Sequence, residues 1–351
     1  MTIHSTARAD LSAPRSVEEL DELLSRPTAG VVDAFRRCTG DVLVLGAGGK
    51  MGLTCVRMAC RAADEAGDSR RVLAVSRFST PGAAAAIRAA GADVQVADLS
   101  DREQLLKLPD APNVVYLAGQ KFGTRDAPSQ TWLANVIVPF SVAERFRSSR
   151  IVALSTGNVY PLVSVQSEGS IESDPLGPVG EYASTCVGRE RVFEHAAAAR
   201  GTLVSLVRLN YAVDLRYGVL VDVASKVWRG EPIDVTMGYA NVIWQGDACA
   251  QALQCLPLAA APPFIVNVTG PERLSIRSVA LELGRLLDRE VHLVGREAGD
   301  ALLSNTARAR SLFGPPTVPS ETLLVWVAEW IRHERPLLGK ATHFQERGGN
   351  F

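Results

Sequence analysis

The sequence predicts an α/β protein built on a doubly wound parallel sheet. Short apolar runs rich in β-branched residues occur at 41–45, 71–77, 92–100, 113–119, 150–156 and 202–210. Between them lie longer stretches whose apolar residues recur at helical spacing. Strands that alternate with helices are typical of a parallel sheet covered by helices on both faces. A glycine-rich turn directly follows the first run, which is the second observation in favour of this fold class.

Composition excludes several classes of protein. The chain has 351 residues, 47% of them apolar and 21% charged, which is typical of a globular protein of about two domains. A net charge of −1 argues against nucleic acid as a partner, and no apolar run is long enough for a bilayer. The N-terminus lacks the apolar core of a secretory signal, and the six cysteines follow no disulfide or metal pattern. We therefore expect a cytoplasmic protein with no membrane partner and no metal site.

The glycine-rich turn has the spacing of a dinucleotide-binding loop. Gly46, Gly49 and Gly52 form G-x-x-G-x-x-G between the first strand and the first long helix, and enclose Lys50 and Met51. The first glycine permits the tight turn, the second lets the backbone approach a pyrophosphate, and the third lets the helix pack against the strand. The phosphates would lie at the N-terminus of that helix.

The end of the second strand bears on the choice between NAD and NADP. A carboxylate there would favour NAD, but the sequence has Ser76 and Arg77, which favours the 2′-phosphate of NADP. Arg77 could instead be a solvated surface residue. Asp98 ends the third strand and is placed to bind the adenine, or alternatively to cap the next helix.

These patterns divide the chain into three parts. Residues 1–40 read as a helical N-terminal extension, and residues 41–210 as a Rossmann-type NAD(P)-binding domain. After residue 210 the alternation becomes irregular, and we expect 211–351 to form a smaller C-terminal substrate-binding lobe, partly woven back into the sheet.

Several segments together resemble the extended short-chain dehydrogenase/reductases, the NAD-dependent epimerase/dehydratase family. They are the glycine motif, ADLS (97–100), YLAG (116–119), LANV around Asn135, LSTGNVYP (154–161) and EYAST (181–185) followed by GRE, and the resemblance extends over about residues 41–335. It implies an NAD or NADP cofactor, a small sugar-like substrate and a homodimer. It also implies cofactor contacts from Leu99, Leu117, Ala118, Gly119 and Asn135.

In that family a serine or threonine, a tyrosine and a lysine perform the chemistry, the last two as Y-x-x-x-K on one helix. The matching residues are Thr156 and Tyr182, but the lysine position holds Cys186. Tyrosine would be the general acid/base, whereas a neutral thiol lacks the charge that lowers the pKa of the tyrosine.

Three hypotheses follow from this departure. The chain is an active oxidoreductase, epimerase or dehydratase in which another cation, best Lys121, supplies the charge. Alternatively, Cys186 is a nucleophilic or redox-sensing thiol, or the chain is a dinucleotide-binding regulator or scaffold without redox chemistry. Retention of Thr156, Tyr182 and Asn135 favours the first hypothesis.

The substrate side offers polar and aromatic side chains that suit a polyhydroxylated ligand. The candidates are Asn158, Tyr160, Asn210, Tyr211, Arg216, Tyr217 and Trp244. Each of these side chains could instead serve packing or lie on the surface.

Overall fold

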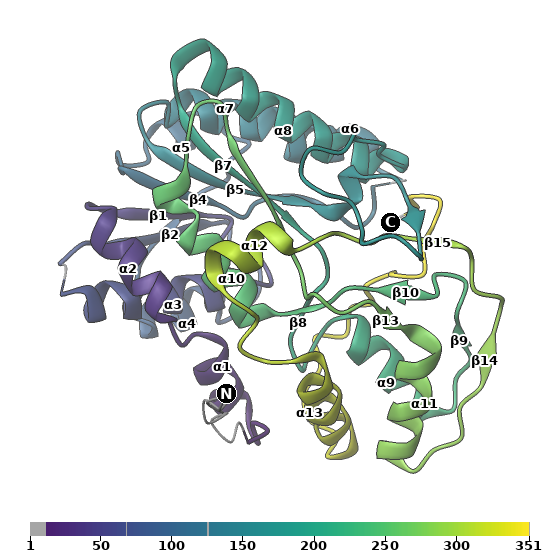
Figure 1. Ribbon diagram of the computed structural model, residues 1–351. Coiled ribbons are helices and arrows are strands. Elements are labelled where there is room, and N and C mark those ends of the chain that lie inside the picture. Colours follow the sequence, from purple (N-terminus) through teal and green to yellow (C-terminus); the bar gives the residue numbers. More distant parts are fainter. Residues whose placement is uncertain (1–11, 68, 125, 351) are drawn as a thin grey trace, which may run out of the picture.

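The computed structural model describes residues 12–350 except 68 and 125. Its centre is a seven-stranded parallel sheet in the order β12-β7-β5-β4-β1-β2-β3 (Figure 1). The strands are β1 (Val42–Leu45), β2 (Val72–Ser76), β3 (Asp93–Val96), β4 (Asn113–Tyr116), β5 (Arg150–Thr156), β7 (Leu203–Leu209) and β12 (Phe264–Val268). The predicted doubly wound parallel sheet is confirmed. The strand order reverses between β1 and β4, and ligands of such sheets bind at the carboxyl ends of the strands at this switch point.

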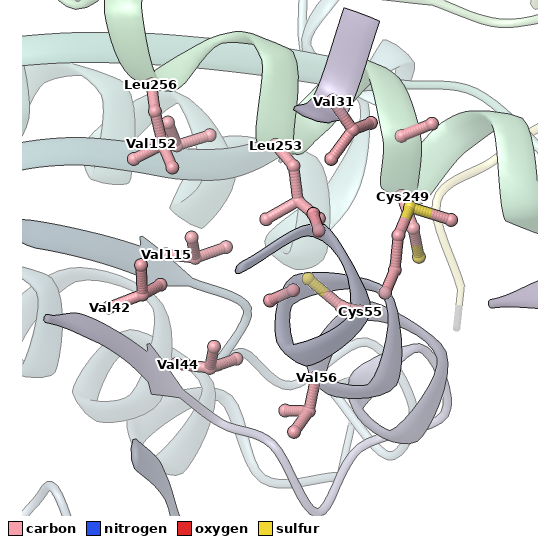
Figure 2. Packing of buried hydrophobic residues seen from close by; sticks show 14 of the residues in the cluster. Val31, Val42, Val44, Cys55, Val56, Val115, Val152, Cys249, Leu253 and Leu256 are labelled. Atoms are coloured by element: carbon pink, nitrogen blue, oxygen red, sulfur yellow. The ribbon is translucent and has the colours of Figure 1, made fainter. Parts of the chain in front are cut away.

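Helices cover both faces of the sheet because its strands are apolar on both sides. One face packs against α2 (Ala29–Arg37), α3 (Gly52–Ala66) and α10 (Gln245–Gln254). Figure 2 shows Val44, Val115 and Val152 of the strands facing Val56 of α3 and Leu253 of α10. The other face packs against α5 (Arg102–Leu106), α7 (Val138–Arg145) and α8 (Gly180–Arg200).

The helical segment between β4 and β5 is interrupted. The structure has α6 (Pro128–Trp132), a π-helical turn η1 (Leu133–Ile137) and then α7. Such π-turns occur frequently at functional sites, and Asn135 lies within this one. In the part of the chain that the structure describes, no helix combines the length and apolar character needed to cross a membrane.

The C-terminal lobe has its own apolar core. It is built from α1 (Val17–Leu24), α9 (Val219–Arg229), α11 (Ile276–Leu287) and α13 (Ser320–Arg332), with short strand pairs beside them. Leu20 of α1 belongs to this core, whereas Phe35 of α2 belongs to the core below the sheet. The first described segment therefore joins the two parts. Strand β12 pairs with β7, so a segment that follows residue 210 completes the sheet.

A C-terminal tail, residues 335–350, runs from α13 across the molecule to the start of α8 (Figure 1). The Leu338 amide donates to the Arg216 carbonyl at 3.0 Å, and the Phe344 side chain is buried in the core of the lobe. Arg347 pairs with Asp300. At its end, Gly349 lies so close to the Val179 carbonyl that a Cβ there would be 2.2 Å from the oxygen. The tail is therefore an integral part of the packed structure.

Candidate active site

The glycine loop lies at the switch point of the sheet, and its glycines are required by close contacts. A Cβ on Gly46, whose φ is +86°, would lie 2.5 Å from the Ala118 amide nitrogen beyond β4. A Cβ on Gly52 would lie 1.9 Å from the Ala47 carbonyl oxygen, so only glycine lets α3 begin this close to β1. The loop thus leads directly into a helix N-terminus, which fits the pyrophosphate of a dinucleotide.

The ends of β2 and β3 carry the residues expected at the adenosine. The Arg77 guanidinium lies 3.8 Å from the Asp98 carboxylate, and its side chain is 72% exposed. Asp98 also accepts from the Ser100 amide and hydroxyl at 2.9 and 2.7 Å, and this pair of bonds lowers the pKa of Asp98. The cap of helix α5 is Asp101 rather than Asp98. Ser76 ends β2 beside the loop, since its Oγ would be 2.7 Å from a Cβ on Gly48.

Asn135 is fully engaged by the protein. Its Oδ1 accepts from the Gln120 amide at 2.8 Å and from Arg189 at 2.6 Å. Its Nδ2 donates to the Gln120 carbonyl at 2.8 Å and to the Thr185 hydroxyl at 3.0 Å. The side chain of Asn135 thus ties the loop after β4 to α8, and a contact of this amide with the cofactor stays a prediction.

Arg189 is a buried cation to which the sequence assigns no role in hydride chemistry. It also donates to the Leu154 carbonyl at 2.9 Å, and it lies beneath Gly119, where a Cβ would be 2.4 Å from Nη2. Its Nε has no hydrogen-bond partner, and none of the ion pairs between described residues involves Arg189. The neighbouring Glu190 pairs with Arg208 instead. Arg189 is therefore a buried guanidinium held by hydrogen bonds rather than by a direct ion pair, with the Glu190 charge nearby.

Tyr182 and Thr156 meet as the resemblance implies. The Tyr182 phenol interacts with the side chains of Thr156 and Cys186. The Thr156 hydroxyl itself donates to Asn158 Oδ1 at 3.0 Å. Burial and then the Cys186 thiol raise the pKa of Tyr182 above its usual value, whereas Arg189 and the Thr156 hydroxyl oppose this rise. The phenol is therefore protonated at neutral pH. Cys186 is itself fully buried and burial raises its pKa, which speaks against a reactive thiolate.

These groups open into one pocket with a cavity volume of about 140 Å³. The pocket lies where the glycine loop, the ends of β5 and β7, α8, α9 and the C-terminal tail converge. Its lining comprises Lys50, Met51, Lys121, Ser155, Thr156, Asn158, Tyr182, Leu209, Asn210, Tyr211, Ala212, Tyr217, Gly218, Val219 and Thr342.

Two lysines from different loops point into this pocket. The Lys121 ammonium lies 5.9 Å from the centroid of the Tyr182 ring and donates to the Thr342 carbonyl at 3.3 Å. The Lys50 ammonium lies 3.5 Å from the centroid of the Tyr217 ring. Burial lowers the pKa of Lys121 to about 8. The Lys50 side chain is exposed overall, yet burial around its ammonium lowers the pKa of Lys50 to about 7, an effect that the Asp214 carboxylate partly opposes.

The predicted substrate residues separate into two groups. Asn158, Asn210 and Tyr211 line the pocket. Tyr160 is buried, donating to Asn267 at 2.8 Å and accepting from Arg208, and it borders only a smaller neighbouring cavity.

Trp244 and Arg216 require correction. The Trp244 ring packs edge-on against Trp326, 5.7 Å between centroids, inside the core of the lobe. Arg216 pairs with Asp21 and Asp214 at 2.9 and 3.0 Å. Both side chains are thus engaged away from the pocket.

Tyr217, a candidate from the same segment as Arg216, lines the pocket, whereas Thr342 is a pocket residue that the sequence did not reveal. Thr342 carries no signal because its segment lies outside the resemblance. Arg189 lies three residues after Cys186 and seven after Tyr182, so the three residues share one face of the helix. This periodicity could have revealed that Arg189 lies near the site. Over the described ranges, no cluster of three His, Cys, Asp or Glu is placed to hold a metal ion.

Comparisons with known proteins place this geometry among known folds. No family model matches the sequence, and no curated protein matches it either. Solved structures do match. UDP-glucose 4-epimerase of Thermotoga maritima, with UDP-glucose, has a TM-score of 0.69 at 17% identity over 84% of this chain and 99% of that one. dTDP-glucose 4,6-dehydratase of Bacillus anthracis, in complex with NAD, has a TM-score of 0.69 at 15% identity over 84% and 97%. The UDP-Glc/GlcNAc 4-epimerase of Campylobacter jejuni has a TM-score of 0.67 at 19% identity over 84% and 100%. The chain therefore has the fold of the extended short-chain dehydrogenase/reductases.

Proposed function

We propose that this chain is an NAD(P)-dependent enzyme that oxidises, reduces or epimerises a hydroxyl or carbonyl group of a small, sugar-like substrate. One observation carries this proposal: Thr156 and Tyr182 line the same pocket that the glycine loop enters through Lys50 and Met51. A protein that only bound a dinucleotide would not need an acid/base pair at this position.

The cofactor assignment depends on the loop and on the end of β2. The backbone between Gly46 and Gly52 would hold the pyrophosphate, and Gly119 and Ala118 would border the cofactor on the β4 side. We propose NADP as the preferred cofactor, because Arg77 is exposed at the end of β2 and no carboxylate precedes it on that strand. A 2′-phosphate would compete with Asp98 for the Arg77 guanidinium.

A nicotinamide cofactor, when bound, exchanges hydride with a substrate carbon. Tyr182 then handles the proton of the substrate oxygen, giving it to a carbonyl during reduction and taking it from a hydroxyl during oxidation. Thr156 holds the same oxygen by a hydrogen bond. Burial keeps Tyr182 protonated, but donating its proton leaves a phenolate and accepting a proton starts from one, so both roles need nearby positive charge.

Arg189 and Lys121 would supply this positive charge in place of the missing lysine. The Arg189 guanidinium lies in the protein interior below Gly119 and does not line the pocket. It would influence Tyr182 through Asn135 and through the helix that carries both residues, so we describe it as a positioning residue. Lys121 lies on the pocket side. The positive charge would therefore lie on Arg189, about one helical turn after Cys186 on α8, and on Lys121 in the loop after β4, rather than at position 186.

The experiment is a spectrophotometric screen for NAD(P)H formation or consumption. Hexoses, hexuronic acids, small keto compounds and nucleotide sugars are offered with each cofactor. Tyr182→Phe should lower turnover at least about a hundredfold while cofactor affinity stays within about twofold. Tyr239→Phe is the matched control, because Tyr239 lies on β10 (Tyr239–Ala240) outside the pocket. Equal turnover by Tyr182→Phe and wild type would refute the mechanism.

The alternative is a dinucleotide-binding regulator without redox chemistry. The specific observation in its favour is Cys186 at the lysine position together with the raised pKa of Tyr182. The same screen separates the two proposals: tight cofactor binding without turnover of any compound class favours the regulator.

A further inference from the structure

The C-terminal tail contributes a backbone group to the active site. Thr342 is buried and lines the pocket together with Tyr182. Its carbonyl oxygen accepts a hydrogen bond from the Lys121 ammonium at 3.3 Å. The same ammonium lies 5.9 Å from the centroid of the Tyr182 ring. The tail therefore contacts the cation that would support the acid/base tyrosine.

The tail and the loop after β4 meet through two neighbouring pairs of residues. Beside the bond between Lys121 and Thr342, the ring of Phe122 lies 5.7 Å from that of His343, measured between centroids. A lysine side chain has a long and flexible stem, so its charge stays at one place when the protein provides a fixed partner. Contacts from two consecutive residues on each side give the Thr342 carbonyl this fixed position.

Asp222 of α9 holds the tail at the same point. Its Oδ2 accepts from the Thr342 amide at 2.8 Å and from the Thr342 hydroxyl at 2.6 Å. The Thr342 hydroxyl oxygen in turn accepts from the Phe344 amide at 3.2 Å, and the Phe344 ring is buried in the core of the lobe. The carbonyl that contacts Lys121 is thus anchored to a helix and to an apolar core.

Asp222 also acts on the charge of Lys121. Burial lowers the pKa of Lys121, and the nearby Cys186 and Asp222 groups oppose this lowering. One carboxylate therefore both holds the tail and favours the charged form of the amine that the tail contacts.

We infer that the C-terminal tail completes the active site: Thr342 is a positioning residue that holds the Lys121 ammonium beside Tyr182, and Asp222 holds Thr342. This inference rests on the proposed function for the role of Tyr182. It goes beyond that function because it gives a role in the reaction to a segment outside the family resemblance and to a carboxylate of the lobe.

The first test follows Lys121 in the resting protein. Acetylation with a trace of acetic anhydride from pH 6 to 10, read by mass spectrometry, measures the pKa of the Lys121 amine. Asp222→Asn keeps an acceptor for Thr342 but removes the charge, so it should lower that pKa by at least about half a unit. Asp247→Asn is the matched control, because Asp247 accepts from the Thr317 amide and hydroxyl at 2.9 and 2.7 Å outside the pocket. The control should leave the pKa of Lys121 unchanged.

The second test measures turnover of a substrate identified in the spectrophotometric screen. Thr342→Val removes the hydroxyl that Asp222 binds, so it should lower kcat about tenfold and shift the pH profile of turnover upward. Cofactor affinity should stay within about twofold. Thr342→Ser keeps the hydroxyl and should retain at least about half of the turnover. Thr317→Val is the matched control and should retain all of it.

Three results would each overturn the inference. They are wild-type turnover and pH profile in Thr342→Val, an equal loss of turnover in Thr342→Val and Thr342→Ser, and an unchanged or higher pKa of Lys121 in Asp222→Asn. The acetylation test needs no substrate and therefore separates this inference from the proposed function. The expected change in Lys121 without turnover of any compound would refute the proposed function and leave the placement of Lys121 by the tail standing.

Discussion

Replacing Lys121 with methionine should stabilise the free protein at neutral pH. The Lys121 ammonium is held in a pocket where burial lowers its pKa from 10.5 to about 8. Each pH unit of this difference corresponds to about 1.36 kcal/mol, so folding disfavours the charged form by up to about 3 kcal/mol. Methionine keeps the unbranched stem but loses the bond to the Thr342 carbonyl, which is worth about 1 kcal/mol. The net expectation is a gain of about 1–2 kcal/mol in the free energy of unfolding at pH 7.

The pH dependence of this gain follows from the same two pKa values. Between pH 8 and 10.5 the unfolded chain binds a proton at Lys121 that the folded protein does not bind. The contribution of Lys121 to the free energy of unfolding of the wild type therefore rises with pH in this range. Above about pH 10.5 both states are neutral and the cost disappears. The advantage of Lys121→Met should therefore be full below pH 8 and nearly absent at pH 10.5.

Urea denaturation of both proteins at pH 7, 8.5 and 10 measures the difference directly, since all other titrating groups are shared. Lys107→Met, at an exposed lysine, serves as the control and should change stability by less than about 0.5 kcal/mol. A Lys121→Met protein that is less stable than wild type at pH 7, or a difference that stays constant with pH, would refute the reasoning.

Three further predictions address the charge, the loop and the pocket. Arg189→Leu should lower turnover about 10- to 100-fold and shift the pH profile of turnover upward by about one unit. Adding Cys186→Lys should restore both turnover and profile. If this second substitution fails to do so, the role of Arg189 is purely structural. Gly52→Ala should cost about 1–3 kcal/mol, because its Cβ would lie 1.9 Å from the Ala47 carbonyl oxygen, and an unchanged unfolding midpoint would contradict this. Thr156→Ala should lower turnover about tenfold or more with cofactor affinity nearly unchanged, because Thr156 would hold the reacting oxygen in the pocket, and wild-type turnover would contradict this role.

Local patterns predicted the parts of the fold that local chemistry determines. The buried strand Val42–Leu45, the glycine turn and the helix after it follow from residue types within a few positions of one another. Thr156 and Tyr182 could be predicted because the segments that carry them keep these two residues, although Cys186 replaces the lysine of Y-x-x-x-K.

The remaining features depend on contacts between distant segments. The aromatic ring of Trp244 is of a type that can stack on a ligand. Whether such a ring faces a pocket or a core depends on its neighbours, and here the neighbour is Trp326. Asn135 illustrates the same limit, since its bonds to Gln120 and Arg189 depend on the packing of helices against the loop after β4. The closure of the pocket by Thr342 joins residues more than 200 positions apart and leaves no local signature.

Binding of a nicotinamide cofactor at the glycine loop is the central property proposed for this protein. The most direct measurement is to denature protein purified without added nucleotide, identify any released cofactor and its redox state by mass spectrometry and absorbance, and titrate the emptied protein with NAD(H) and NADP(H). We predict either retained cofactor or micromolar binding, with NADPH preferred over NADH and the preference lost in Arg77→Ala. Tight NAD(H) would contradict the role given to Arg77, and no affinity for either cofactor would contradict cofactor binding itself.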